Sequence, residues 1–241
     1  MQIHLFDTAA QVGQAAAILI ASQIMQKPDS VLGLATGSSP IPTYRQLIAW
    51  HKEGVVDFSR AITFNLDEYV GLPADHPASY RAFMQAELFS QINVRQENIH
   101  IPNGSAKSLQ RECSDYDTAI SRAGGIDLQL LGIGRNGHIG FNEPHEQFVY
   151  GCHVVHLTQS TIDANRRFFA PGEEVPSKAV SLGVGSIMNA RRVVLIATGA
   201  DKAQSIRRAI REDVNPQVQA SILRTHRDVI FLLDRAAAGM L

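Results

Sequence analysis

The arrangement of apolar segments constrains the fold of this 241-residue chain more than any other feature. Short, mostly apolar segments of strand length alternate with longer segments that have the pattern of helices. The expected strands are residues 30–35, 61–66, 126–131, 193–197 and 229–233. Strands with nearly continuous apolar runs are buried on both faces, which is typical of parallel strands in α/β proteins. The alternation therefore predicts an α/β fold with a mainly parallel sheet and helices on both of its faces.

Capping residues mark where several helices begin. Thr8-Ala-Ala-Gln11 has the pattern of a capping box, and Ser79 and Ser108 are good N-caps. The expected helices are residues 9–27, 40–51, 79–92, 108–122 and 201–211. No repeat, low-complexity linker or break in composition divides the chain, so we expect a single domain of residues 1–241. Residues 236–241 are expected to form a frayed tail.

Charge and cysteine content exclude several classes of protein. The 22 basic residues nearly balance the 23 acidic ones, so we expect no nucleic-acid or membrane partner. Cys113 and Cys152 lack the spacing of a CxxC motif and are expected to be free thiols in a reducing compartment. The first residues lack the pattern of a signal peptide, and the most apolar stretch, residues 15–21, is too short to span a bilayer. These features predict a soluble, cytoplasmic protein.

A glycine-rich segment follows the expected strand at residues 126–131. Residues 132–144 read Gly-Ile-Gly-Arg-Asn-Gly-His-Ile-Gly-Phe-Asn-Glu-Pro, with four glycines within nine residues. A turn of this kind at the end of a strand lets a ligand approach the backbone closely. His138 can carry a proton near neutral pH, and Glu143 is a candidate partner that orients its ring. A lone histidine favours a structural role, but the density of polar groups, which includes Asn136, favours a functional site.

Two other expected strands also end in polar residues. Thr36-Gly-Ser-Ser39 precedes a helix and is either an anion site or a set of plain helix caps. Because it matches neither a P-loop nor the GxGxxG dinucleotide motif, the ligand that fits best is the phosphate of a small metabolite. Asp67 is either a partly desolvated base with a raised pKa or, as is commoner for a lone Asp-Glu pair, a cap or surface ion pair. Since the carboxyl ends of parallel strands share one edge, these segments can meet the glycine-rich segment.

Positive side chains that could bind a phosphate occur later in the chain. Arg167 lies beside two phenylalanines, and guanidinium groups suit bidentate phosphate binding. Lys202 lies at an expected helix start, and each of these charges, taken alone, is typical of a solvated surface. The segment His153-Val-Val-His156 has no further ligand at metal-binding spacing, so we expect it to be the surface of a strand and predict no metal site.

Three motifs of the chain resemble the glucosamine-6-phosphate deaminase family. They are Thr63-Phe-Asn-Leu-Asp-Glu-Tyr-Val-Gly-Leu72, Gly134-Arg-Asn-Gly-His-Ile-Gly-Phe-Asn-Glu-Pro144 and Ser181-Leu-Gly-Val-Gly185. The resemblance extends from the Thr36-Gly-Ser loop to Leu233. It implies a Rossmann-like α/β fold, no cofactor, and a hydrolase that converts glucosamine 6-phosphate and water to fructose 6-phosphate and ammonia. The related sugar lactonases share the Gly-His turn but generally lack the Phe-Asn-Glu-Pro ending.

The resemblance also implies roles for individual residues. Asp67 corresponds to the enolising base of the family, His138 to the acid and base of ring opening, and Glu143 to its charge partner. Some members carry Asp in place of Asn136, so the network here lacks a possible negative charge, but shorter members also carry Asn and activity is still expected. The segment around Arg167 corresponds to a mobile lid. The residues implied in phosphate binding are Thr36, Gly37, Ser38, Ser39, Arg167 and Lys202.

Two alternative functions belong to other classes. A lactone hydrolase acting on a 6-phosphosugar acid needs the same phosphate contacts but no enolising base. A non-catalytic phosphosugar sensor usually carries a DNA-binding segment, and this chain has no basic helix-turn-helix pattern. Both alternatives lack a use for Asp67, whereas the deaminase reaction requires it.

Regulation can also be predicted from the resemblance. Longer, allosteric family members bind N-acetylglucosamine 6-phosphate through an Arg and a Lys after the Asn-Glu-Pro turn and a Tyr in a longer C-terminal tail. The matching positions here are His153 and Val155, and the chain ends at Leu241. Val155 offers no charge to a phosphate and neutral His153 offers little. We therefore expect hyperbolic kinetics without this activation, and a monomer or small homo-oligomer.

Overall fold

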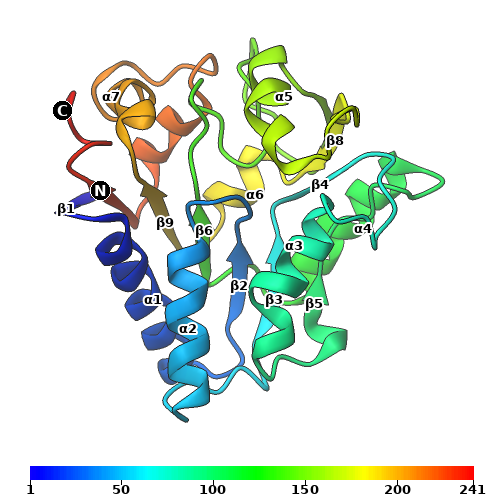
Figure 1. Ribbon diagram of the computed structural model, residues 1–241, viewed down its shortest axis with the longest axis vertical. Helices are drawn as coiled ribbons and strands as arrows, with labels where there is room; N and C mark the ends of the chain where they lie inside the picture. The colour runs from blue at the N-terminus through cyan, green and yellow to red at the C-terminus, as the bar shows by residue number, and fades with distance from the viewer.

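Seven parallel strands form the main sheet of the protein in a computed structural model that describes residues 1–241 (Figure 1). In spatial order they are β1 (Gln2–Phe6), β10 (Val229–Asp234), β9 (Arg192–Ala197), β6 (Leu128–Leu131), β2 (Val31–Leu34), β3 (Ile62–Asn65) and β5 (Ile99–His100). The central strands β2, β6 and β9 are almost fully buried, because nearly all of their side chains are apolar on both faces. The predicted parallel sheet is confirmed, and β1 and β5 are edge strands that the sequence pattern did not indicate.

A second, antiparallel sheet lies beside the end of β3. It contains β4 (Asp67–Tyr69), β8 (Lys178–Ser181) and β7 (His153–His156). Leu66 alone separates β3 from β4, and its backbone bonds both to Leu34 of β2 and to Leu182 after β8. The expectation of one strand at residues 61–66 was therefore wrong at its end, because the chain passes to the second sheet there. Residues 153–156 do form a half-buried strand, as expected.

Five of the helices that flank these sheets begin within two residues of the predicted starts, and the two short helices between residues 159 and 188 were not predicted. In chain order the helices are α1 (Ala9–Gln26), α2 (Ile41–Lys52), α3 (Tyr80–Glu87), α4 (Leu109–Arg122), α5 (Gln159–Asn165), α6 (Val184–Met188) and α7 (Ala203–Arg211). The capping box is formed: the Gln11 N–H donates to Thr8 Oγ1 at 3.2 Å, and the Thr8 N–H donates to Gln11 Oε1 at 3.1 Å. Helix α3 ends earlier than predicted because Leu88 leaves the helical conformation and is buried with Phe89.

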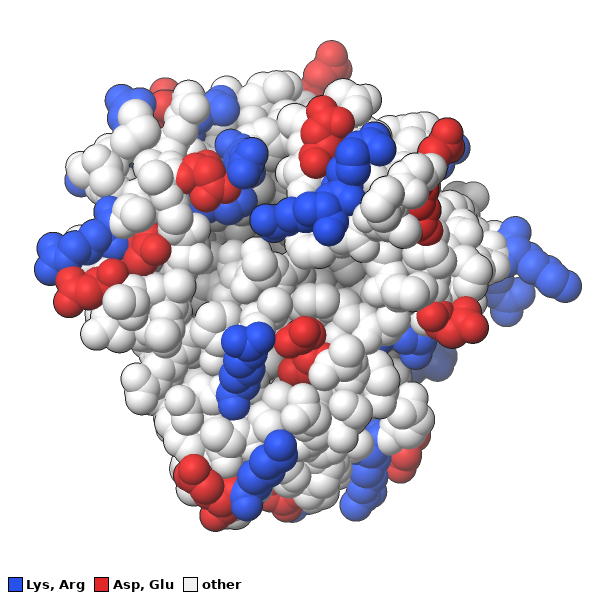
Figure 2. Space-filling view, in the orientation of Figure 1, with Lys and Arg blue, Asp and Glu red and all other residues white.

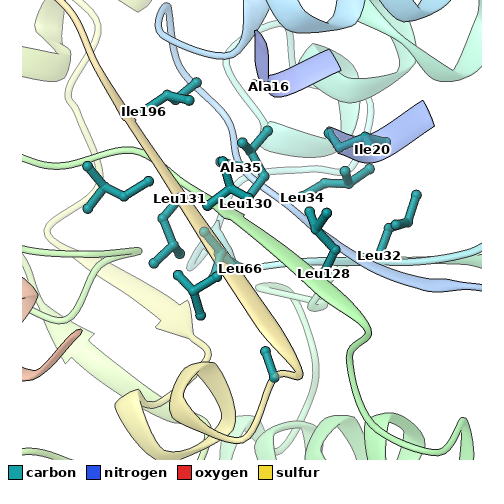
Figure 3. Packing of buried hydrophobic residues seen from close by; sticks show 14 of the residues in the cluster. Ala16, Ile20, Leu32, Leu34, Ala35, Leu66, Leu128, Leu130, Leu131 and Ile196 are labelled. Carbon is teal, nitrogen blue, oxygen red and sulfur yellow. The ribbon is translucent and has the colours of Figure 1, made fainter. Parts of the chain in front are cut away.

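Helix α1 packs on the sheet through its small and branched side chains. Figure 3 shows Ala16 and Ile20 of α1 beside Leu32, Leu34 and Leu128 of the strands. All five are nearly inaccessible to solvent, and burial of an aliphatic side chain of this size stabilises a fold by roughly 1.5–3 kcal/mol. This packing places α1 against one face of the main sheet, and the polar loops emerge from the carboxyl ends of β2 and β6.

The C-terminal residues are held in place, contrary to the expectation of a frayed tail at 236–241. Ala237 is completely buried in the main core, and its N–H donates to Asp234 Oδ1 at 2.7 Å. The carboxylate of Asp234 thus caps the turn, and the small alanine fits beneath it.

Elsewhere, Cys113 and Cys152 are free cysteines, and no helix combines the length and apolar character that a bilayer crossing requires.

Candidate active site

A cavity lies at the carboxyl ends of β2, β6 and β9, roofed by α5 and the turn that follows it. Figure 2 shows basic and acidic side chains gathered around a hollow on this part of the surface. Every residue predicted for the site lines this cavity except Glu143, which lies behind His138. The residues in question are Thr36, Gly37, Ser38, Ser39, Asp67, Asn136, His138, Arg167 and Lys202.

The imidazole of His138 lies flat against the backbone of Gly134. A Cβ atom at Gly134 would be 2.3 Å from Cε1 and 2.4 Å from Nε2 of this ring, so no other residue fits without moving the histidine. The turn is closed by a hydrogen bond from the Gly134 N–H to the His138 carbonyl, with a length of 2.9 Å. The glycine-rich sequence therefore places the histidine ring tightly in the wall of the cavity.

A hydrogen-bond network orients the ring through its Nδ1 side. Nδ1 is 3.5 Å from Glu143 Oε2 and 3.5 Å from Thr161 Oγ1. Glu143 Oε1 in turn accepts the N–H of Thr158 at 3.2 Å and its hydroxyl at 3.3 Å. No protein group bonds to Nε2 of His138, so this nitrogen is available to a ligand.

The charge of Glu143 is stabilised in this setting. Burial alone would raise its pKa, but hydrogen bonds from His138, Thr161 and Asn136 and the positive charge of protonated His138 outweigh it. The pKa of Glu143 is lowered to about 2 as a result. Glu143 is therefore an anion throughout the neutral range and can stabilise an imidazolium on His138.

Asn136 joins the two partners of this pair. Its Oδ1 accepts the backbone N–H of His138 at 3.1 Å, and its Nδ2 donates to Glu143 Oε2 at 2.7 Å. An aspartate could make the first bond but would place a second carboxylate oxygen against Glu143. The amide thus suits a network in which Glu143 alone carries the negative charge.

Asp67 faces the same cavity from the first position of β4. Its side chain makes no hydrogen bond within the protein, and the backbone of Gly140 comes so near that a Cβ there would be 3.4 Å from Asp67 Oδ2. Burial, reinforced by the charge of neighbouring Glu68, raises the pKa of Asp67 to about 8. This is a carboxylate placed to accept a proton, which is the less common of the two interpretations of the Asp-Glu pair.

Glu68 has a separate structural role. Its carboxylate accepts the backbone N–H groups of Tyr69 at 2.9 Å, Tyr80 at 3.0 Å and Arg81 at 2.9 Å. It therefore joins β4 to the start of α3. Of these two adjacent acids, only Asp67 lines the cavity.

The opposite end of the cavity is suited to an anion. Gly37 has φ +89° in the Thr36–Ser39 loop, and no side chain caps α2, whose first flanking residue is Pro40. The loop hydroxyls are therefore not helix caps, which removes one of the two alternatives for this segment. Arg167 reaches over the loop and donates from Nη2 to Ser38 Oγ at 3.4 Å.

Several residues in or beside the cavity were not predicted from the sequence. Arg135 and Asp201 form an ion pair at the anion end, with Arg135 Nε 2.9 Å from Asp201 Oδ2. Thr158 and Thr161 hold the pair of His138 and Glu143 from the start of α5. The Thr-x-x-Thr spacing is a usable helix-cap signal, whereas the ion pair joins positions 66 residues apart and has no local signal. The structure contains no group of three or more His, Cys, Asp or Glu side chains arranged for a metal ion.

Comparison with known proteins gives a consistent result. The family model described as glucosamine-6-phosphate isomerases and 6-phosphogluconolactonase matches residues 6–231. The glucosamine-6-phosphate deaminase of Thermoanaerobacter sp. (strain X514) is 51% identical over 241 residues, which cover 100% of this chain and 95% of that protein. The enzyme of the same name from Clostridium botulinum (strain Loch Maree / Type A3) is 48% identical, with 100% and 99% covered.

Solved structures show the same similarity. A monomeric glucosamine-6-phosphate deaminase superposes with a TM-score of 0.97 at 42% identity, with 100% of both chains covered. The 6-phosphogluconolactonase of Trypanosoma brucei superposes with a TM-score of 0.78 at 21% identity, covering 100% of this chain and 98% of that one. The second similarity shows a shared fold only, because its sequence identity is low.

Proposed function

Because this chain belongs to the family of glucosamine-6-phosphate isomerases and 6-phosphogluconolactonases, we propose that it converts glucosamine 6-phosphate and water to fructose 6-phosphate and ammonia. One observation carries the proposal beyond the family: Asp67, buried and without a hydrogen-bond partner, faces the cavity that His138 also lines. A reaction that moves a proton between two carbons needs such a base. The relatives near 50% identity that match this chain over its whole length bear the name of this deaminase.

The substrate phosphate is bound at the end of the cavity formed by the Thr36–Ser39 loop. Its oxygens accept hydrogen bonds from the loop and from Arg167 and Lys202, which line this end. Binding at a point distant from the reacting carbons orients the sugar and supplies part of the energy used in catalysis.

Ring opening is assigned to His138. Protonated Nε2 donates to the ring oxygen of the sugar, the hydroxyl proton at C1 passes to solvent water, and the C1–O5 bond breaks to give the open-chain aldehyde. The ionised carboxylate of Glu143, 3.5 Å from Nδ1, stabilises the protonated ring and keeps it oriented. Asn136 holds both partners in this arrangement.

Enolisation is assigned to Asp67. Its carboxylate removes the proton from C2 of the open-chain sugar while the aldehyde oxygen takes up a proton from solvent, which gives an enolamine. The proton on Asp67 then passes to C1, which leaves a protonated imine at C2. Water then adds to C2 and ammonia departs, which balances the overall reaction. The raised pKa of Asp67, about 8, makes the carboxylate a stronger base than an ordinary aspartate.

The lactonase and sensor alternatives find less support. Lactone hydrolysis has no step for a base at the position of Asp67, and the lactonase similarity at 21% identity extends to the fold alone. A sensor has no need of the ordered pair His138 and Glu143. The proposal includes a cytoplasmic monomer that needs no cofactor, in keeping with the similarity to a monomeric deaminase.

A direct assay tests the proposal. Purified protein is incubated with glucosamine 6-phosphate, and ammonia and fructose 6-phosphate are measured in separate coupled reactions. We expect equal amounts of the two products. Hydrolysis of 6-phosphogluconolactone with no release of ammonia from the amino sugar would contradict the proposal.

A further inference from the structure

Asp201 is an acidic residue at the end of the cavity where the phosphate is placed. Its Oδ2 atom lies 2.9 Å from Nε of Arg135 and 3.9 Å from Nζ of Lys202. Arg167 lines the same cavity. A negative side chain in this position repels a phosphate, so its presence calls for a physical reason.

The charge balance at the phosphate end of the cavity supplies a physical reason for the presence of Asp201. Arg135, Arg167 and Lys202 contribute three positive charges among the residues lining this end, and Asp201 contributes one negative charge. The net charge of two matches the charge of about −1.5 to −2 that a phosphate monoester carries near neutral pH. Without a ligand the three cations repel one another, and Asp201 relieves part of this repulsion. In agreement, burial and the charges of Arg135 and Arg167 lower the pKa of Lys202, while Asp201 opposes the change.

The backbone of Arg135 belongs to the glycine-rich turn of residues 132–144, which also carries His138. Arg135 stands between Gly134, whose N–H bonds to the His138 carbonyl at 2.9 Å, and Asn136, whose side chain bonds to Glu143. Asp201 lies in the turn after β9, a different strand end. The ion pair therefore fixes the Arg135 guanidinium at the mouth of the cavity from two independent elements.

We propose that Arg135 is a third cationic ligand of the substrate phosphate, and that Asp201 holds Arg135 and Lys202 in place and competes with the phosphate for them. This inference rests on the proposed function, because it takes the ligand to be a sugar phosphate. It predicts effects of opposite sign: loss of Arg135 weakens phosphate binding, and loss of the Asp201 charge strengthens it.

An ordinary surface ion pair predicts a different pattern. The side chains of Arg135 and Asp201 are 65% and 43% exposed, and exposed pairs of this kind contribute little to stability. If stability were their only role, either substitution would break the same pair and neither would change ligand binding. The sign of the effect at Asp201 therefore distinguishes the two explanations.

The experiment compares Arg135→Gln, Asp201→Asn, the double variant and Arg135→Lys with the parent protein. Arg207→Gln is the matched control, because the pair of Arg207 and Glu212 is similarly exposed, at 48% and 42%, and lies outside the cavity. For each protein, kcat and KM are measured with glucosamine 6-phosphate. The Kd of inorganic phosphate is measured by calorimetry, and the melting temperature confirms folding.

For Arg135→Gln we expect KM and the phosphate Kd to rise about tenfold, with kcat changed by less than about twofold, since a charge-assisted contact remote from the reacting carbons is lost. For Asp201→Asn we expect both constants to fall about threefold, because a nearby like charge is removed. Arg135→Lys should retain part of the affinity, and Arg207→Gln should match the parent.

Constants within about twofold of the parent for Arg135→Gln, or weaker phosphate binding by Asp201→Asn, would overturn the inference. The calorimetric arm involves no turnover, so it tests Arg135 and Asp201 even if the parent protein releases no ammonia. Failure of the proposed function and failure of this inference are thereby distinguishable.

Discussion

Replacement of Gly134 by alanine tests whether the position of the His138 ring determines activity. The added Cβ would lie 2.3 Å from Cε1, 2.4 Å from Nε2 and 2.5 Å from Nδ1 of the imidazole, whereas an ordinary contact between such atoms is about 3.5–4.0 Å. The ring must therefore move by roughly 1 Å or more from the position in which its Nδ1 lies 3.5 Å from both Glu143 and Thr161. A displacement of this size at a catalytic group costs about 10²-fold in rate.

Gly132→Ala is the matched control for this experiment. Gly132 lies two positions earlier in the same turn, and a Cβ there would meet no atom within 4 Å. We expect Gly134→Ala to lower kcat/KM for glucosamine 6-phosphate by about 10²-fold or more and to destabilise the fold by about 1–3 kcal/mol. Gly132→Ala, whose added Cβ borders the cavity but contacts no protein atom, should lose much less activity, because the His138 ring stays in place. Equal activities of the two folded variants, measured in the coupled assay alongside thermal unfolding, would refute the proposed role of the ring position.

Three further predictions concern the acid–base groups and regulation. His138→Gln should slow the cyclic substrate by about 10²-fold or more but still bind an analogue locked in the open form; equal loss of binding for both ligands would indicate a general binding role. Because the pKa of Asp67 is raised to about 8, kcat/KM should increase as pH rises through 8 and this carboxylate loses its proton; a profile that is flat between pH 6 and 9 would contradict the assignment. Rate curves should be hyperbolic without activation by N-acetylglucosamine 6-phosphate, because Val155 offers no charge; a sigmoidal curve that this effector makes hyperbolic would show otherwise.

The raised pKa of Asp67 also affects the stability of the folded protein. The folded-state pKa of Asp67 is raised above its unfolded value, so this group favours the folded state most at low pH, and that contribution is lost as pH rises from about 4 to 8. At pH 8 the buried carboxylate must give up hydration to remain charged. Asp67→Asn removes this cost, and we expect a melting temperature at least a few degrees above that of the parent at pH 8.

Much of the main sheet could be predicted because its strands are apolar on both faces. Strands β2, β6, β9 and β10 lie within one or two residues of the predicted limits. The second sheet was harder to predict, since β4 is only three residues long and pairs with β8, which is more than 100 residues away in the chain. Its short strands carry little periodicity, and the switch of sheets at Leu66 depends on tertiary contacts.

The candidate site, like the fold, could be predicted from the sequence only in part. Asp67, His138 and the Thr36–Ser39 loop could be expected together because parallel strands place their carboxyl ends along one edge. The sequence left open whether Asp67 was a base and whether the loop hydroxyls were caps; the structure shows no side-chain cap on α2 and buries Asp67 beside the cavity, and its role as a base stays a prediction. The pair of Arg135 and Asp201 joins two loops that only the folded chain brings together.

The turnover of Asp67→Asn tests the proposed mechanism most directly, because an amide cannot accept the proton of C2. The variant is assayed with glucosamine 6-phosphate for ammonia release, and its binding of inorganic phosphate is measured in parallel. We predict that kcat falls by at least roughly 10²-fold while phosphate binding stays close to that of the parent. Turnover within about tenfold of the parent would contradict the assignment of Asp67 as the enolising base.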